Sequence, residues 1–188
     1  VERLDQIINQ FLGAIRPQPP AMQPQDLSSI LQETLDFMQH EIKDRGILAE
    51  VEAGKDLPAV QADRGQIKQA FFNLIKKAVQ AMSEGGLLKL QVTATERFVA
   101  VSFQDNGPGI VPEQLGRIFE PYHTTKQEGS GLGLMIVQRI VRDHGGEIEV
   151  DSEPGVGTAF TLYLPRDERR IRLLKAPRAQ DTKKGKGA

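Results

Sequence analysis

The chain has 188 residues, of which 39% are hydrophobic and 26% are charged, and its net charge is −1. This composition is ordinary for a globular chain, one large enough for a well-buried core plus an appendage. The absence of cysteine excludes disulfides and thiolate chemistry, and no apolar run approaches the twenty or so residues of a membrane span.

Residues 1–16 have the apolar spacing of a coiled-coil helix, which Pro17 ends. The steps of three and four run through Val1, Leu4, Ile8, Phe11 and Ile15. Two heptads are too few for a stable coiled coil, so we interpret this segment as the end of a longer helix; a lone amphipathic helix packed on its own domain is the alternative. Residues 17–25 are rich in proline and are predicted to be a linker.

Two aspartates predict where the first helices of the main domain begin. Asp26 is placed to cap a helix that Gly46 stops. A strand is expected next, around residues 47–51. Asp63 is placed to cap a second helix, which the glycine pair 85–86 closes.

Alternating hydrophobicity predicts the strands that follow. Residues 87–95 and 98–105 should form one hairpin, and residues 147–152 and 158–165 another around the turn EPGVG. Between the hairpins, a helix is expected over GLGLMIVQRIVRDH. Because most consecutive strands are joined by short turns, we predict an α/β sandwich: a mixed, mainly antiparallel sheet with helices on one face.

Residues 166–188 form a basic tail beyond the main domain, which we place at residues 26–165. Nine Lys or Arg against three acidic residues give the tail a net charge of +6. Few large apolar residues follow residue 175, so disorder is predicted at the end of the chain.

Three stretches carry candidate site residues, and none of them decides a function alone. On the helix QAFFNLIKKAVQAM, Asn73 and Lys77 lie on a narrow polar stripe, which a solvated edge would also explain. DNGPGI places the acceptor Asp105 at a strand end before two glycines that let a flat ligand approach, although an ordinary turn has the same residues. EGSGLGLMIV opens into a helix whose N–H groups favour phosphate, although it could be a plain flexible connection.

Taken together and in this order, the stretches resemble a known family. They are similar to the N box, the F box and the glycine boxes of the catalytic, ATP-binding domain of sensor histidine kinases, which belong to the GHKL ATPase superfamily. The matching stretches, in order, are the helix with Asn73, DNGPGI, IFEPYHTTK, GSGLGLMIV and GTAFTLYLP. The resemblance covers residues 26–165, implies the Bergerat ATP-binding fold and looks strongest for nitrogen-regulation-type kinases. It also identifies residues 1–16 as the end of a dimerisation helix.

The resemblance implies a role for each matched residue. Asp105 is expected to bind the adenine amino group, with Thr158 helping through water and Ile110 covering the base. Phe119 is expected to anchor a lid in which Lys126 reaches the phosphates. The expected backbone cradle of the nucleotide includes Leu132 and the glycines Gly107, Gly109, Gly129, Gly131 and Gly133.

One position departs from the family pattern. Where the N box has a second asparagine, whose oxygen binds Mg²⁺, this chain has Lys77, and lysine has three donors and no acceptor. Asn73 is therefore the expected metal ligand, ATP binding is expected to survive, and Mg²⁺-dependent phosphoryl transfer is expected to be impaired. No catalytic residue is expected here, because none of His40, His123 and His144 lies in a phosphoacceptor motif.

The leading hypothesis is the enzyme domain of a two-component sensor histidine kinase, which transfers the γ-phosphoryl of ATP to a histidine outside this chain. A degenerate nucleotide-binding module without kinase activity is the alternative that Lys77 favours. A single-domain serine kinase that binds a sigma factor is a third, but it gives no reason for the heptads and the proline linker.

The same hypothesis sets the expected partners. These are ATP with Mg²⁺, the protein's own dimerisation and phosphoacceptor domain, and the receiver domain of a response regulator, in a homodimer of the full-length protein. No direct nucleic-acid partner is expected. The expected location is the cytoplasm, and attachment of the full-length protein to a membrane is left open.

Overall fold

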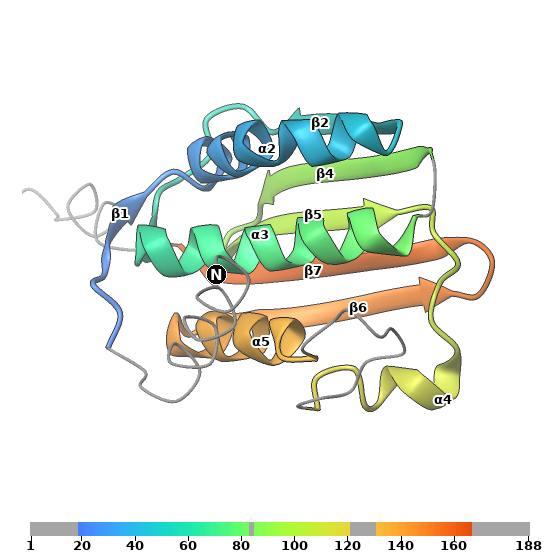
Figure 1. Cartoon of the computed structure of the whole chain (residues 1–188). Coiled ribbons are helices and arrows are strands. Elements are labelled where there is room, and N and C mark those ends of the chain that lie inside the picture. Colours follow the sequence, from blue (N-terminus) through green and yellow to red (C-terminus); the bar gives the residue numbers. More distant parts are fainter. Residues whose placement is uncertain (1–18, 83–84, 121–130, 167–188) are drawn as a thin grey trace, which may run out of the picture.

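The computed structural model describes residues 19–82, 85–120 and 131–166. In this part, a five-stranded sheet carries the long helices α2, α3 and α5 on one face (Figure 1). The expected dimerisation helix at 1–16, most of the lid at 121–130 and the tail from 167 onward lie outside the described residues.

The elements follow one another as the sequence patterns predict, with two short strands added. In chain order they are β1 (Gln23–Gln25), α2 (Leu27–Asp44), β2 (Ile47–Ala53), β3 (Val60–Ala62), α3 (Arg64–Ala81), β4 (Gly86–Ala94), β5 (Phe98–Asp105), α4 (Pro112–Leu115), α5 (Gly133–Asp143), β6 (Glu147–Glu153) and β7 (Gly157–Pro165).

The main sheet has the strand order β2-β4-β5-β7-β6. The pair β2–β4 is parallel and all other neighbours are antiparallel. The connection from β2 to β4 contains α3, as parallel neighbours require a long crossover, whereas β4–β5 and β6–β7 are joined by short turns. The predicted fold, a mixed and mainly antiparallel sheet with helices on one face, is confirmed.

A two-stranded ribbon of β1 and β3 lies at the edge of the domain. The sequence predicts a linker over 17–25 and gives no strand signal there. The ribbon depends on β3, the partner strand of β1, which is fixed to the domain because its residues Val60 and Ala62 are buried, at 0% and 1% exposure. The backbone N–H of Ala21 also donates to Oδ2 of Asp63, 2.9 Å away, which fixes the approach to the ribbon.

The predicted helix caps are present. Asp26 accepts a hydrogen bond from the backbone of Ser28, and Asp63 accepts one from the backbone of Gln66 at 3.0 Å. Gly46 follows α2 at a φ of +64°, in the left-handed region that glycine adopts easily.

His144 holds the end of α5 against the start of α3. Its Nε2 accepts the backbone N–H of Asp63 at 2.9 Å, so Nδ1 carries the proton and donates to the carbonyl of Ile140 at 2.7 Å. The ring is 5% exposed. His144 is therefore structural, whereas His40 projects into solvent on α2.

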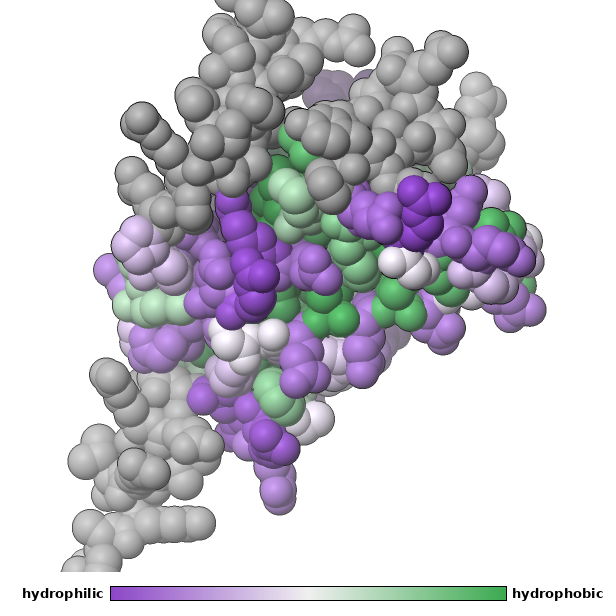
Figure 2. Space-filling model, turned by 90° about the horizontal axis from the view of Figure 1, so that it is seen from below, coloured by the Kyte–Doolittle hydropathy of each residue, from purple (hydrophilic) through white to green (hydrophobic). Residues whose placement is uncertain are grey.

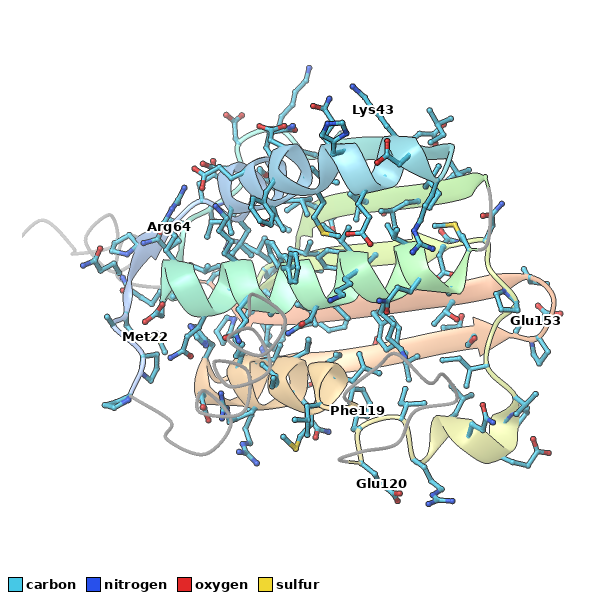
Figure 3. All side chains as sticks on the ribbon, in the orientation of Figure 1. Met22, Lys43, Arg64, Phe119, Glu120 and Glu153 are labelled. Carbon is cyan, nitrogen blue, oxygen red and sulfur yellow. The ribbon has the colours of Figure 1, made fainter. Side chains whose placement is uncertain are left out.

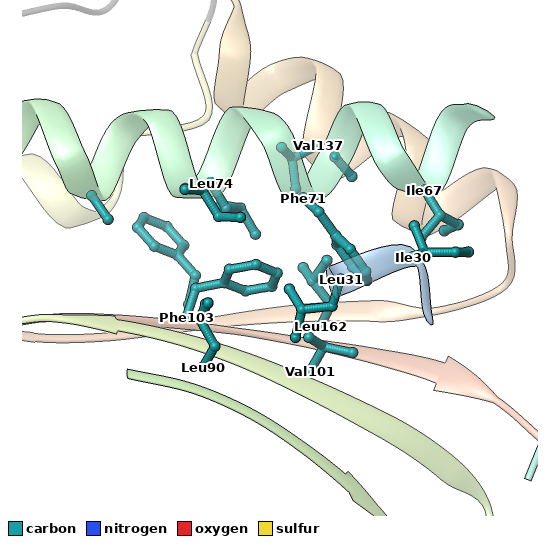
Figure 4. Close-up of a cluster of buried hydrophobic side chains, with 14 of the residues drawn as sticks. Ile30, Leu31, Ile67, Phe71, Leu74, Leu90, Val101, Phe103, Val137 and Leu162 are labelled. Atoms are coloured by element: carbon teal, nitrogen blue, oxygen red, sulfur yellow. The ribbon is translucent and has the colours of Figure 1, made fainter. Parts of the chain in front are cut away.

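The hydrophobic core fills the space between the sheet and the helices (Figure 4). On β4 the buried residues Leu88, Leu90 and Val92 alternate with exposed ones, so one face of the sheet packs and the other faces solvent. Phe71 of α3 and Phe103 of β5 meet at the centre, with ring centroids 5.3 Å apart.

One face of the described domain has a mixed surface. Figure 2 shows the molecule from below, where hydrophobic residues lie between hydrophilic ones. Among the described residues, no helix is long and apolar enough to cross a membrane.

We expect Phe71→Ala to lower the free energy of unfolding by about 3–5 kcal/mol, because it removes a 0%-exposed ring and leaves a cavity. Phe37→Ala is the matched control, since this ring is 73% exposed and its loss should change stability by less than about 0.5 kcal/mol. Urea unfolding measures both. Equal losses in the two variants would contradict the assigned core.

Candidate nucleotide-binding site

Three polar residues stand in one row across the ends of three strands. Asp105 of β5 pairs with Thr158 of β7, which pairs in turn with Ser152 of β6. Directly paired residues point to the same face of a sheet. Asp105 and Thr158 are 6% and 7% exposed, so the row lies on the helix-covered side, at the margin of the core.

The Asp105 carboxylate is buried and partly compensated. Its Oδ1 accepts the backbone N–H of Gly107 at 2.9 Å. Burial raises the pKa of this carboxyl, while the backbone N–H groups of Gly107 and Thr158 and the charge of Lys77 oppose the rise. A buried carboxylate at the end of a strand is suited to accept a hydrogen bond from a donor of a ligand.

The loop after β5 is held by the turn between β6 and β7. The backbone N–H of Gly155 donates to the carbonyl of Pro108 at 2.8 Å, and that of Ile110 donates to Oγ of Ser152 at 2.9 Å. Gly109 has a φ of +70°, and a Cβ there would lie 2.2 Å from the carbonyl oxygen of Glu153. This glycine is thus required by the packing of the loop itself, which the sequence alone did not show.

The polar stripe of α3 faces the same region from the other side. A Cβ on Gly133 would lie 3.7 Å from Oδ1 of Asn73, so the asparagine amide lies beside the start of α5. Lys77, one turn further along α3, is exposed and acts electrostatically on Asp105. The stripe therefore borders both the buried carboxylate and the N-terminus of α5.

The start of α5 is suited to an anion. Gly131 has a φ of +65°, and Leu132 takes the N-cap position, where no side chain of the described part caps the first turn. The N–H groups of a first helical turn have no intrahelical partners and carry partial positive charge. Gly131, Leu132 and Gly133 can therefore present backbone donors to a phosphate.

Two apolar residues of the predicted set are also described. Ile110 and Phe119 are partly buried and pack against the core. Phe119 lies between α4 and the start of α5 (Figure 3). The lid residues Lys126 and Gly129 lie outside the described residues.

Ser152 was missed by the sequence analysis. A serine within an alternating strand carries no signal of a site, and only the strand register shows that it stands beside Thr158. Asn106 was also assigned no role; its Oδ1 accepts the backbone N–H of Leu87 at 2.8 Å and thereby fixes the loop to the start of β4.

Comparisons with known proteins show the family of this chain. Residues 62–168 match the family described as histidine kinase-, DNA gyrase B- and HSP90-like ATPase. The sensor histidine kinase ZraS of Escherichia coli (strain K12) is 37% identical over 164 residues, or 87% of this chain and 35% of that protein. Sporulation kinase E of Bacillus subtilis (strain 168) is 33% identical over 88% of this chain and 22% of that protein. This chain thus spans about a third of ZraS and less of the sporulation kinase.

Solved structures show the same likeness. The catalytic domain of histidine kinase ThkA superimposes with a TM-score of 0.72 at 32% identity, covering 77% of this chain and 95% of that one. Full-length ShkA, solved in complex with AMPPNP, gives a TM-score of 0.78 at 28% identity, covering 87% and 36%. ThkA in complex with the response regulator TrrA gives 0.76 at 28% identity, covering 88% and 48%.

The chain therefore belongs to the histidine kinase-, DNA gyrase B- and HSP90-like ATPases. Within that family it is a histidine kinase catalytic domain, as the resemblance implied.

We expect Asp105→Asn to stabilise the protein without ligand at neutral pH. Burial holds the pKa of Asp105 in the folded state above the unfolded value of 3.8. As the pH rises through the folded pKa, the wild type must therefore bury a charge and loses stability, whereas the neutral asparagine of the variant does not. The gain in the variant should shrink at pH values below 3.8. Thermal unfolding at several pH values measures it.

Asp151→Asn is the matched control, because Asp151 is exposed on β6 of the same sheet and its change should shift stability by less than about 0.5 kcal/mol. If Asp105→Asn is less stable than the wild type at every pH, the N–H donors and Lys77 outweigh the burial of the charge, and the assigned electrostatics are wrong.

Proposed function

We propose that the chain is the ATP-binding catalytic domain of a two-component sensor histidine kinase, and that the whole protein passes the γ-phosphoryl of ATP to a histidine outside this chain. One observation supports this most strongly: the row that contains Asp105, the start of α5 and the amide of Asn73 surround a single region. An acceptor for a base and donors for phosphates are thus provided by one site.

The base would bind at the row. The Asp105 carboxylate accepts, and an adenine amino group donates, so the two are complementary. Thr158 pairs directly with Asp105, and Ile110 supplies an apolar side chain from the loop beside them. A ligand with an amino group next to a flat apolar ring fits this combination.

The phosphates would bind at the start of α5. The backbone N–H groups around Leu132 offer donors and partial positive charge. Asn73 lies against Gly133 and can add an amide to the same contacts. Lys77 adds a full positive charge one helical turn away, and an ammonium pairs well with phosphate oxygens.

The described residues fit Mg²⁺ poorly. Asn73 offers one neutral oxygen, whereas Lys77 offers a cation and no lone pair at the position of the family's second asparagine. Among the described residues there is no group of three or more His, Asp or Glu that could hold a metal. Mg²⁺ normally neutralises charge that develops between the β and γ phosphates, so phosphoryl transfer should be impaired in this chain.

The site also favours transfer to a side chain over hydrolysis. Asn73 stands where hydrolysing relatives of the superfamily carry a glutamate, and an amide cannot take a proton from water.

Lys77 favours a second candidate function, a nucleotide-binding module without kinase activity. With a lysine in place of the metal ligand, ATP would bind through direct contacts between the ammonium and the phosphates. Such a domain would act through its conformation, or through a partner that senses the bound nucleotide.

The partners follow from the same proposal. The whole protein would form a homodimer through its dimerisation domain, which also carries the phosphoacceptor histidine, and would then phosphorylate the receiver domain of a response regulator. The solved complex of ThkA with the response regulator TrrA supports this for a relative of the same fold. The nitrogen-regulation subgroup and the cytoplasmic location remain predictions.

We expect this chain to bind a non-hydrolysable ATP analogue with nearly the same affinity with and without Mg²⁺, and Lys77→Asn to gain about tenfold in affinity on addition of Mg²⁺, or about 1.4 kcal/mol. The reason is that the asparagine restores an oxygen ligand. Isothermal titration calorimetry of both proteins measures it.

Lys76→Asn is the matched control, because the Lys76 ammonium lies over the Phe72 ring, 5.8 Å from its centroid, on the side of α3 that faces α2. This variant should behave like the wild type. A strong Mg²⁺ enhancement in the wild type itself would show that Lys77 does not impair metal binding, and an ordinary kinase would become the better description. If the wild type binds no nucleotide, the proposed function is wrong.

A further inference from the structure

The hydroxyl of Ser152 has three polar neighbours. Its Oγ lies 2.9 Å from the backbone nitrogen of Ile110, 3.0 Å from the carbonyl oxygen of Gly157 and 2.9 Å from Oγ1 of Thr158. These neighbours come from the loop after β5 and from the first two residues of β7. Ser152 thus joins the three segments that form the base end of the site.

Only one arrangement of hydroxyl hydrogens makes all three contacts hydrogen bonds. A serine hydroxyl has one hydrogen and two lone pairs. The carbonyl of Gly157 cannot donate, so it must accept the hydrogen of Ser152. The N–H of Ile110 takes one lone pair, and the other is left for Thr158. Thr158 must therefore donate its own hydroxyl hydrogen to Ser152.

This arrangement decides what Thr158 offers to a ligand. With its hydrogen directed at Ser152, the Thr158 hydroxyl can only accept. Asp105, its direct partner across the strands, offers a carboxylate, which also accepts when ionised. Two acceptors then stand side by side at the base end, and they favour an amino group over a carbonyl oxygen.

We propose that Ser152 is a positioning residue that sets the base specificity of this site, by holding the Thr158 hydroxyl as an acceptor. The inference rests on the proposed function, namely that a purine nucleotide binds at Asp105. Adenine carries an amino group where hypoxanthine carries a carbonyl oxygen. The inference adds that the site selects adenine over hypoxanthine in part through Ser152, which touches neither base.

The surroundings of Ser152 keep this arrangement rigid. Gly157 has a φ of +147°, and a Cβ there would lie 2.0 Å from the carbonyl oxygen of Asp105. Gly155 bonds to Pro108 across the same interface. These contacts therefore hold the turn between β6 and β7 against the loop after β5, so that the hydroxyl of Ser152 cannot easily turn to another acceptor.

The test compares the affinities of the 188-residue chain for ATP and for ITP by isothermal titration calorimetry without Mg²⁺. In Ser152→Ala the Thr158 hydroxyl is free to rotate and donate to the carbonyl of ITP. One hydrogen bond is worth about 0.5–1.5 kcal/mol, so the ratio of ATP to ITP affinity should fall about two- to tenfold. Ser152→Cys fills the same space with a weak acceptor and should lower the ratio as well.

Ser102→Ala is the matched control. Ser102 on β5 also accepts a threonine hydroxyl, that of Thr161 on β7 at 3.4 Å, but this pair lies on the opposite face of the sheet from Asp105. Its loss should leave the affinity ratio unchanged. A general loosening of the sheet would change the ratio in both serine variants.

A double-mutant cycle separates positioning from a merely structural role. Because Ser152 acts through Thr158, Ser152→Ala should lower the ratio in the wild type and have no further effect in the Thr158→Val background. The inference is wrong if the ratio of ATP to ITP affinity is unchanged in both Ser152→Ala and Ser152→Cys. It is also wrong if Ser152→Ala lowers this ratio as much in the Thr158→Val background as in the wild type. If the wild type binds neither nucleotide, the proposed function fails instead.

Discussion

The burial of a carboxylate at the end of a central strand is the constraint on which this structure depends. Asp105 lies between neighbouring strands on both sides, at 6% exposure, and burial raises the pKa of its carboxyl. An isolated charge there would be strongly unfavourable. The loop after β5 returns the N–H of Gly107 to the carboxylate, and the close contacts at Gly109 and Gly157 keep that loop in place. Gly107, Gly109 and Gly157 thus help to hold the buried carboxylate, in addition to any contact with a ligand.

Helix α3 connects this charge to the phosphate end of the site. Its apolar face packs against the sheet through Phe71, while its polar stripe faces α5 and the end of β5. The helix is covered on most of its sides, and the narrow stripe with Asn73 and Lys77 borders the candidate site. Lys77 partly compensates Asp105, and we propose that the same charge opposes a metal ion.

Most of the fold could be predicted from the sequence because local signals specify it. The caps Asp26 and Asp63 and the alternation along β4 and β5 located helices and strands, and the ordered motifs identified the family. The β1–β3 ribbon could not be predicted, because Gln23–Gln25 has no apolar pattern and the strand exists through its partner. Of the site, the motif residues were proposed from the sequence and remain predictions. Ser152 was not proposed, since its contacts arise from strand register between segments with no shared local signal.

The most direct test of this site is an amide chemical-shift titration of the isotope-labelled chain with ADP. A nucleotide that binds between Asp105 and the start of α5 should cause the largest shifts at the backbone amides of Gly107, Gly109, Gly131, Gly133 and Thr158. Residues on the open face of the sheet, such as Gln91 and Thr161, should remain unshifted. Shifts concentrated on that open face, with none at these glycines, would contradict the assigned site.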